Sequence, residues 1–138
     1  MAMQIFVNLA VKDLQRTIAF FERLGFGFDA RFTDDNATCM VVSDGIYVML
    51  LVEPFFQTFT PRPVADARAT TEVLMCLGVE SRARVDELVA AAVAGGGRTL
   101  KPAKDHGFMY EHGFEDLDGH LWELVYMEPE GESAAPAA

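Results

Sequence analysis

The stretch Phe114-Glu-Asp-Leu-Asp-Gly-His-Leu-Trp-Glu-Leu124 decides the fold of this chain. Its Asp118-Gly119 pair is a hairpin signal, because glycine readily adopts the positive φ that a tight turn between antiparallel strands requires. A strand is expected after the turn, near residues 120–127. Trp122, Leu124 and Tyr126 alternate along it and should form one apolar face under a helix, while Glu123 points to the other face.

The first half of the chain contains the same features in the same order. Asp44-Gly45 is a second hairpin signal. The segment Leu9-Ala-Val11 in the first half corresponds to Leu77-Gly-Val79 in the second half. Both halves end in Glu-Pro, at Glu53-Pro54 and Glu128-Pro129. Self-similarity over half a chain indicates duplication of one structural unit.

Each half is predicted to form a strand, a helix and three further strands. Asp13 and Ser81 are candidate helix N-caps, each followed by apolar residues at helical spacing, and glycines from Gly25 and from Gly95 end the helices. The expected strands lie near residues 4–11, 28–32, 38–43 and 46–52, and near residues 72–79, 98–100, 107–115 and 120–127. The fold class is therefore α+β, with two βαβββ modules.

These elements divide the chain into four parts. The first module is expected over residues 3–53 and the second over residues 72–129. A connector over residues 54–71 holds Phe55, Phe56 and Phe59, which dock on the core or cover a pocket or a partner subunit. Residues 130–138 are Gly, Ser, Pro, Ala and Glu and read as a disordered tail.

Composition excludes several classes of partner. The chain has 138 residues and a formal net charge of −10, which argues against nucleic acid and anionic membrane surfaces. No apolar run approaches the roughly 20 residues of a membrane-spanning helix, and no secretory signal is recognisable. Two cysteines are too few for a disulfide framework, so a cytoplasmic protein with reduced thiols is expected.

The opening Asn8-Leu-Ala-Val-Lys-Asp-Leu14, with Phe20-Phe-Glu-Arg-Leu-Gly25 and the Phe114–Leu124 stretch, resembles the vicinal oxygen chelate superfamily. That superfamily includes glyoxalase I, extradiol dioxygenases, and fosfomycin-resistance and bleomycin-binding proteins. The chain looks most like bacterial members labelled predicted lactoylglutathione lyases. The resemblance implies sheets curled into an open cup with helices outside, and it implies pairing into a homodimer.

The resemblance also implies where a metal would bind. Metal-dependent members take one ligand from the first strand and one from the last strand of each module. These positions correspond to Phe6, Met49, Leu74 and Glu123 in this chain. Only Glu123 retains a family ligand, and one carboxylate cannot hold a catalytic divalent ion, so no metal and no cofactor are expected.

A few other residues are candidates for ligand binding. Asn8 should share a face with Phe6, either lining the cup or satisfying a neighbouring backbone group. His112 should share a face with Tyr110 and Phe114, either inside the cup or under a helix. Cys76 is expected to be an inert thiol and His106 a solvated loop residue.

The sequence supports four functions. The first is a metal-free module that binds a small molecule around Glu123, with Phe6, Asn8, Met49, Leu74, Tyr110 and His112 as further ligand-binding candidates. The second is a metal-independent enzyme with Glu123 as the catalytic base. The third is a metal-dependent lyase or dioxygenase of the glyoxalase type, and the fourth is a dimeric scaffold without a ligand.

Overall fold

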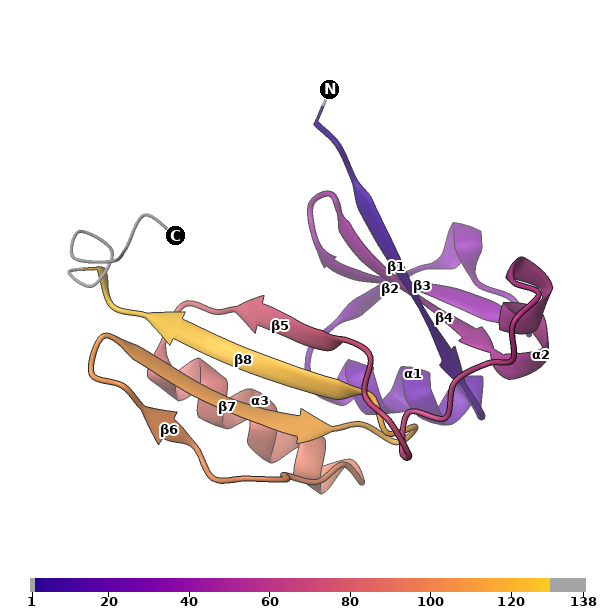
Figure 1. The fold of residues 1–138 in the computed structure, drawn as a ribbon. Helices are drawn as coiled ribbons and strands as arrows, with labels where there is room; N and C mark the ends of the chain where they lie inside the picture. The colour runs from indigo at the N-terminus through magenta and orange to yellow at the C-terminus, as the bar shows by residue number, and fades with distance from the viewer. Residues whose placement is uncertain (1, 130–138) are drawn as a thin grey trace. The chain divides into compact units, whose positions relative to one another are not determined.

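The computed structural model describes residues 2–129, which form two compact units divided between Asp66 and Ala67. The predicted tail lies outside the described residues. Each unit contains one four-stranded mixed sheet, as Figure 1 shows, so the α+β class and the duplicated βαβββ order are confirmed. Among the described residues, no helix has the length and apolar character needed to cross a membrane.

The first unit begins with strand β1 (Ile5–Val11) and helix α1 (Leu14–Arg23). Its other elements are β2 (Gly27–Asp29), the 3-10 turn η1 (Ala30–Phe32), β3 (Ala37–Ser43), β4 (Ile46–Val52), α2 (Glu53–Phe56) and the 3-10 turn η2 (Gln57–Phe59). The strand order is β1-β4-β3-β2, in which β1 and β4 are parallel and the other pairs are antiparallel.

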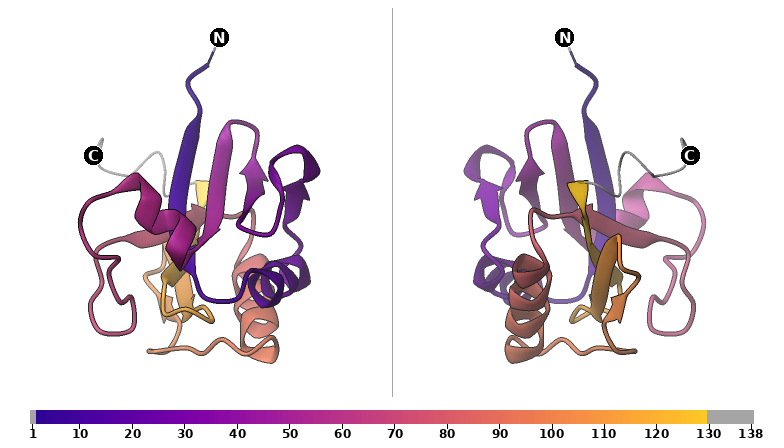
Figure 2. Two further views of the ribbon diagram at one scale, coloured as in Figure 1. Left: turned by 90° about the vertical axis from the view of Figure 1, so that its right-hand side faces the viewer. Right: turned by 90° about the vertical axis from the view of Figure 1, so that its left-hand side faces the viewer.

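The second unit repeats this plan. It consists of β5 (Leu74–Gly78), α3 (Arg82–Ala94), β6 (Lys104–Asp105), β7 (Met109–Glu115) and β8 (Leu121–Met127), with strand order β5-β8-β7-β6. Helix α3 covers one face of β7 and β8, as Figures 1 and 2 show. Trp122 and Leu124 are buried on that face, and the Trp122 ring lies parallel to Phe114 at 6.3 Å between centroids. Tyr126, also expected there, is only half-buried.

The local signals that set the element boundaries are confirmed. The Asp13 carboxylate accepts a hydrogen bond from the Arg16 amide at 3.1 Å, and the Ser81 hydroxyl accepts one from the Arg84 amide at 3.0 Å. Gly45 and Gly119 have φ values of +82° and +96°, the conformation that a side chain would strain. Caps and hairpins follow from short sequence patterns because their partners are near in the chain.

Two predicted strands are wrong in extent. The strand expected over residues 28–32 ends at Asp29, whose carboxylate accepts from the Arg31 amide at 3.0 Å and starts the η1 turn. The strand expected over residues 98–100 is reduced to a single bridge between Arg98 and Glu115. Pro102 has no N–H to donate to a sheet, and pairing resumes only in β6.

The connector is partly structured. Its first residues form α2 and then η2, and α2 contacts β1 and β4. Phe55 and Phe56 are half-buried, whereas Phe59 is 68% exposed and meets Phe55 edge-on at 5.2 Å between ring centroids. Phe55 and Phe56 therefore dock on the first unit, whereas Phe59 does not.

Candidate functional site

The register of the second sheet places Glu123 at its centre. Glu123 lies between Cys76 on β5 and Gly113 on β7. Side chains alternate along a strand, so Glu123 lies on the face opposite to Trp122 and Leu124, which pack beneath α3. We call the face that carries Glu123 the open face.

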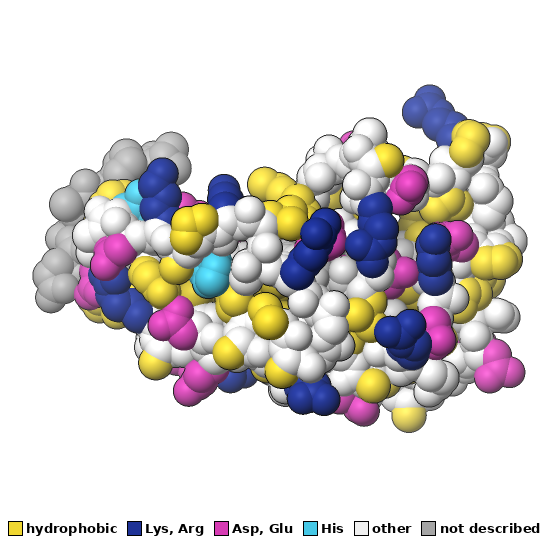
Figure 3. All heavy atoms as spheres, turned by 90° about the horizontal axis from the view of Figure 1, so that it is seen from below, with side chains coloured by type: hydrophobic (Ala, Val, Ile, Leu, Met, Phe, Trp, Pro, Cys, Tyr) yellow, Lys and Arg dark blue, Asp and Glu magenta, His cyan; other side chains and the backbone are white. Residues whose placement is uncertain are grey.

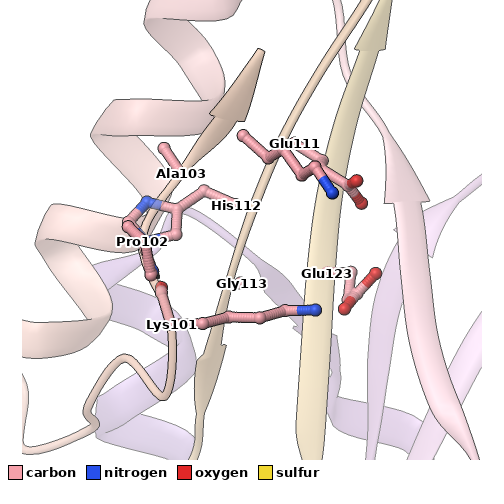
Figure 4. A pocket seen from close by; sticks show the side chains of 8 residues that line it. Lys101, Pro102, Ala103, Glu111, His112, Gly113 and Glu123 are labelled. Carbon is pink, nitrogen blue, oxygen red and sulfur yellow. Dashed lines mark hydrogen bonds between the residues drawn. The ribbon is translucent and has the colours of Figure 1, made fainter. Parts of the chain in front are cut away.

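A pocket of about 210 Å³ lies on this face. It belongs entirely to the second unit and is lined by Lys101, Pro102, Ala103, Lys104, Glu111, His112, Gly113 and Glu123. Figure 4 shows that the strands supply the carboxylates and that the segment before β6 forms the rim, with the Lys101 ammonium pointing toward the Glu123 carboxylate. The pocket therefore combines groups of both charges.

Glu123 is half-buried on this sheet and makes no direct contact that neutralises it. Among residues 2–129, no hydrogen bond or ion pair reaches its carboxylate, nor the ammonium groups of Lys101 and Lys104. These three side chains are therefore available to a ligand.

Glu115 on the same sheet shows what a neutralised carboxylate looks like. It is 6% exposed and accepts hydrogen bonds from Arg98 Nε at 2.8 Å and from Arg68 Nη1 at 3.2 Å. Two arginines thus neutralise the deeply buried carboxylate, whereas Glu123 is only half-buried and has no hydrogen-bond or ion-pair partner in the part of the chain that the structure describes. The contrast indicates that Glu115 is structural and that Glu123 is not needed for the fold.

Glu111 is the second carboxylate of the pocket. Its Oε2 lies 2.6 Å from His106 Nε2, and both side chains are 27% exposed. The prediction that His106 is simply solvated is therefore wrong, because the β6–β7 turn brings its ring back onto β7. The His106 bond fixes the position of one Glu111 oxygen.

Gly113 forms the floor of the pocket beside Glu123. A Cβ built there would lie 2.5 Å from the Trp122 carbonyl oxygen and 3.5 Å from Glu123 Cγ. The first contact is too short for any real side chain, so the position requires glycine. The missing side chain also leaves space above the sheet.

Asp116 holds the Asp118-Gly119 turn against the core of the second unit. It is 4% exposed and accepts hydrogen bonds from Trp122 Nε1 at 3.0 Å and from the amides of Asp118 and His120 at 2.9 and 3.0 Å. Burial raises the pKa of the Asp116 carboxyl, while the charge of His120 and these three bonds act in the opposite direction. Asp116 therefore ties the turn to the core tryptophan.

The structure separates the predicted second-unit candidates from one another. Tyr110 lies on the α3 side, where its hydroxyl donates to Asp86 Oδ1 at 2.6 Å and Arg82 lies 5.5 Å above its ring. Leu74 is 56% exposed on β5 and does not line the pocket. His112 does line it, with Nε2 lying 3.2 Å from the Lys101 carbonyl oxygen.

The first-unit candidates lie together on their own sheet. Phe6 is 47% exposed and stacks on Tyr47 at 4.8 Å between centroids. Asn8 pairs in register with Met49, and its Nδ2 donates to the Phe6 carbonyl oxygen at 3.1 Å. The local role that the sequence offered for Asn8, bonding a neighbouring backbone group, is the one observed.

The residues that the resemblance places at the four ligand positions do not offer the donor atoms of a catalytic metal site. Phe6 and Leu74 offer no lone pair, the Met49 thioether suits copper(I), and Glu123 supplies one carboxylate. Among residues 2–129, no group of three His, Cys, Asp or Glu side chains lies close enough to hold a metal. Beside Glu123, Cys76 keeps its proton, because desolvation and then the charges of Glu123 and Glu111 raise the pKa of its thiol.

Three residues that line the pocket were not predicted from the sequence: Lys101, Lys104 and Glu111. Glu111 could have been predicted from the alternation of side chains along a strand, because Glu111 and Gly113 alternate with Tyr110 and His112 along β7. No local pattern predicts the lysines, since they fall between the strands expected near residues 98–100 and 107–115, in a stretch with no expected strand or helix.

The chain is similar in structure to several solved proteins. A hypothetical protein, SA1046, from S. aureus has 25% sequence identity and a TM-score of 0.78, with 91% of this chain and 94% of that chain covered. A glyoxalase/bleomycin resistance protein/dioxygenase family enzyme from Burkholderia phytofirmans has 16% identity and a TM-score of 0.75, with coverage of 91% and 99%. The fosfomycin resistance protein FosX from Listeria monocytogenes has 20% identity and a TM-score of 0.65, with coverage of 94% and 97%.

Likeness at 16% and 20% identity shows the fold alone. No curated protein matches the sequence. A family model does match, over residues 4–124, which covers both units. With this match and the duplicated βαβββ fold, the chain belongs to the Glyoxalase/Bleomycin resistance protein/Dioxygenase superfamily.

Proposed function

We propose that this protein binds a small molecule in the pocket around Glu123 and that it does so without a metal ion. The pocket of about 210 Å³ is smaller than the roughly 300–1,000 Å³ of sites for drug-sized ligands. A compact ligand with few rotatable bonds therefore suits it.

One observation carries the proposal. Glu123 is a half-buried carboxylate at the centre of a sheet, it borders a pocket, and no hydrogen bond or ion pair from residues 2–129 reaches it. The other deeply placed carboxylates of this unit, Glu115 and Asp116, are both satisfied by specific donors. A half-buried carboxylate at a pocket suits a binding group, because a ligand donor can form a charge-assisted hydrogen bond with it.

The proposal that no metal ion is bound rests on the side chains that could act as metal ligands. A catalytic zinc site keeps three protein ligands, and a non-haem iron site keeps two His and one carboxylate. Of the four positions that the resemblance gives as metal ligands, only Glu123 carries a side chain of these types.

A thermal-shift screen of small fragments tests the proposal. We expect at least one fragment to raise the melting temperature of the wild type and to have a much smaller effect on the Glu123→Gln variant. Glu80→Gln is the matched control, because Glu80 is exposed and does not line the pocket. A fragment that stabilises the wild type and Glu123→Gln equally, with none that discriminates, contradicts the proposal.

We also propose that the chain forms a homodimer in the cytoplasm. Strands β1 and β5 are edge strands of their sheets, and they carry exposed apolar side chains, among them Ile5 at 55% and Leu74 at 56%. Exposed apolar edge strands tend to pair with another chain. Light scattering should give twice the 15.2 kDa of one chain, and a mass of one chain at micromolar concentration refutes the dimer.

A further inference from the structure

We infer that the ligand of the Glu123 pocket is a small zwitterion of the α-amino acid class, with its ammonium group on the carboxylates and its carboxylate at the lysines. This inference rests on the proposed function and adds the chemical class of the ligand. It follows from where the four charged groups of the pocket are held.

The carboxylates belong to the rigid part of the pocket. Glu111 and Glu123 come from paired strands, and Glu111 is held at 2.6 Å by His106. Glu111 pairs with Val125 and Gly113 with Glu123, so the two glutamates are diagonal neighbours. Such neighbours lie roughly 7 Å apart on a sheet, and an ammonium group between them can donate to both.

The positive charges belong to the rim. Lys101 and Lys104 are both exposed. Lys101 stands in the irregular segment before β6, and Lys104 lies on the edge strand β6, opposite Glu111. Figure 4 shows the Lys101 side chain reaching across the pocket toward Glu123. Because lysine is a long, flexible side chain with a compact charge, it can turn from the glutamate to a ligand carboxylate.

The pocket is lined by both positive and negative side chains, which disfavours ligands that carry charge of only one sign. The chain carries a net charge of −10, and the surface in Figure 3 shows acidic and basic side chains interspersed. Within the pocket, two lysines face two glutamates. A simple anion would leave the glutamates unsatisfied and a simple cation would leave the lysines unsatisfied, whereas a zwitterion pairs with both sets.

Calorimetric titration with the common α-amino acids, their N-acetyl derivatives and their carboxamides tests this inference. The N-acetyl derivatives lack the ammonium group and the carboxamides lack the carboxylate. We expect at least one amino acid to bind, and each of its two derivatives to bind about tenfold more weakly or worse. Lys101→Met should weaken binding of the amino acid but not of its carboxamide, and Glu123→Gln should weaken binding of both.

The contradicting outcomes separate the inference from the proposed function. If an N-acetyl derivative or a carboxamide binds as tightly as the parent amino acid, the zwitterion class is wrong. If no amino acid binds but a singly charged fragment stabilises the protein in a Glu123-dependent way, the class is wrong and the pocket still functions. If neither amino acids nor fragments bind, both proposals are wrong.

Discussion

Met49 of the first unit and Glu123 of the second occupy the same place in the same strand register. Met49 lies between Asn8 on β1 and Cys39 on β3, and Glu123 lies between Cys76 on β5 and Gly113 on β7. The buried faces of the two sheets are mostly apolar, with Met40, Val48 and Leu50 in the first and Phe114, Trp122 and Leu124 in the second. The faces that carry Met49 and Glu123 differ, because the first presents Phe6 stacked on Tyr47 and the second presents a charged pocket floored by glycine.

This difference shows how a duplicated fold is maintained while its halves diverge. Packing under a helix constrains one face of each sheet, since a change there opens a cavity or removes a hydrogen bond. The other face is less constrained, although Glu115 is buried there against Arg68 and Arg98. The second unit should therefore depend strongly on Trp122 and Asp116 for stability and weakly on Glu123.

The largest stability effect is expected from Trp122→Ala. The indole is 1% exposed and stacked near Phe114, so its removal leaves a large cavity and should cost about 4 kcal/mol of unfolding free energy. The counterpart in the first unit is Val48, and Val48→Ala should cost less because fewer atoms are lost. Denaturant unfolding measures both, and equal losses would show that the tryptophan does not anchor the second unit.

A smaller loss is expected from Asp116→Ala. Three donors, the Trp122 indole and the amides of Asp118 and His120, would lose their acceptor, at a cost of about 3 kcal/mol. The first-unit hairpin turn carries the exposed Asp44, which corresponds to Asp118, and Asp44→Ala should change stability by less than about 0.5 kcal/mol. Equal effects of the two substitutions in urea unfolding would remove the structural role assigned to Asp116.

Gly113→Ala should have an intermediate effect. The added Cβ would lie 2.5 Å from the Trp122 carbonyl oxygen, so the strands must shift, at a cost of about 2 kcal/mol. Gly78→Ala on the same sheet is the control, because nothing lies within 4 Å of a Cβ at that position. If Gly113→Ala is as stable as Gly78→Ala by thermal unfolding, the floor of the pocket is looser than described.

The smallest stability effect is expected from Glu123→Gln. The substitution preserves shape and no hydrogen bond is lost, so the unfolding free energy should change by less than about 0.5 kcal/mol. Glu115→Gln should cost more, because Arg68 and Arg98 would lose their charged acceptor. Equal costs in urea unfolding would contradict the assignment of Glu115 to structure and Glu123 to binding.

The fold could be predicted from the sequence because its signals are local. The Asp13 and Ser81 caps, the two Asp-Gly turns and the alternation around Trp122 each depend on residues a few positions apart. The arrangement of the pocket depends on contacts that no local pattern specifies. His106 reaches Glu111 only after the β6–β7 turn, and Lys101 follows the point at Arg98 where the expected strand is reduced to a single bridge.

The central claim is that the second unit, through Glu123, binds a small molecule. Chemical-shift mapping on the isotopically labelled protein, with a fragment from the thermal-shift screen, tests it most directly. We predict shifts of the Gly113, Glu123 and Lys101 amides in the wild type, and binding at least about tenfold weaker in Glu123→Gln at unchanged stability. Shifts confined to other parts of the chain, or equal affinity in Glu123→Gln, would contradict the account.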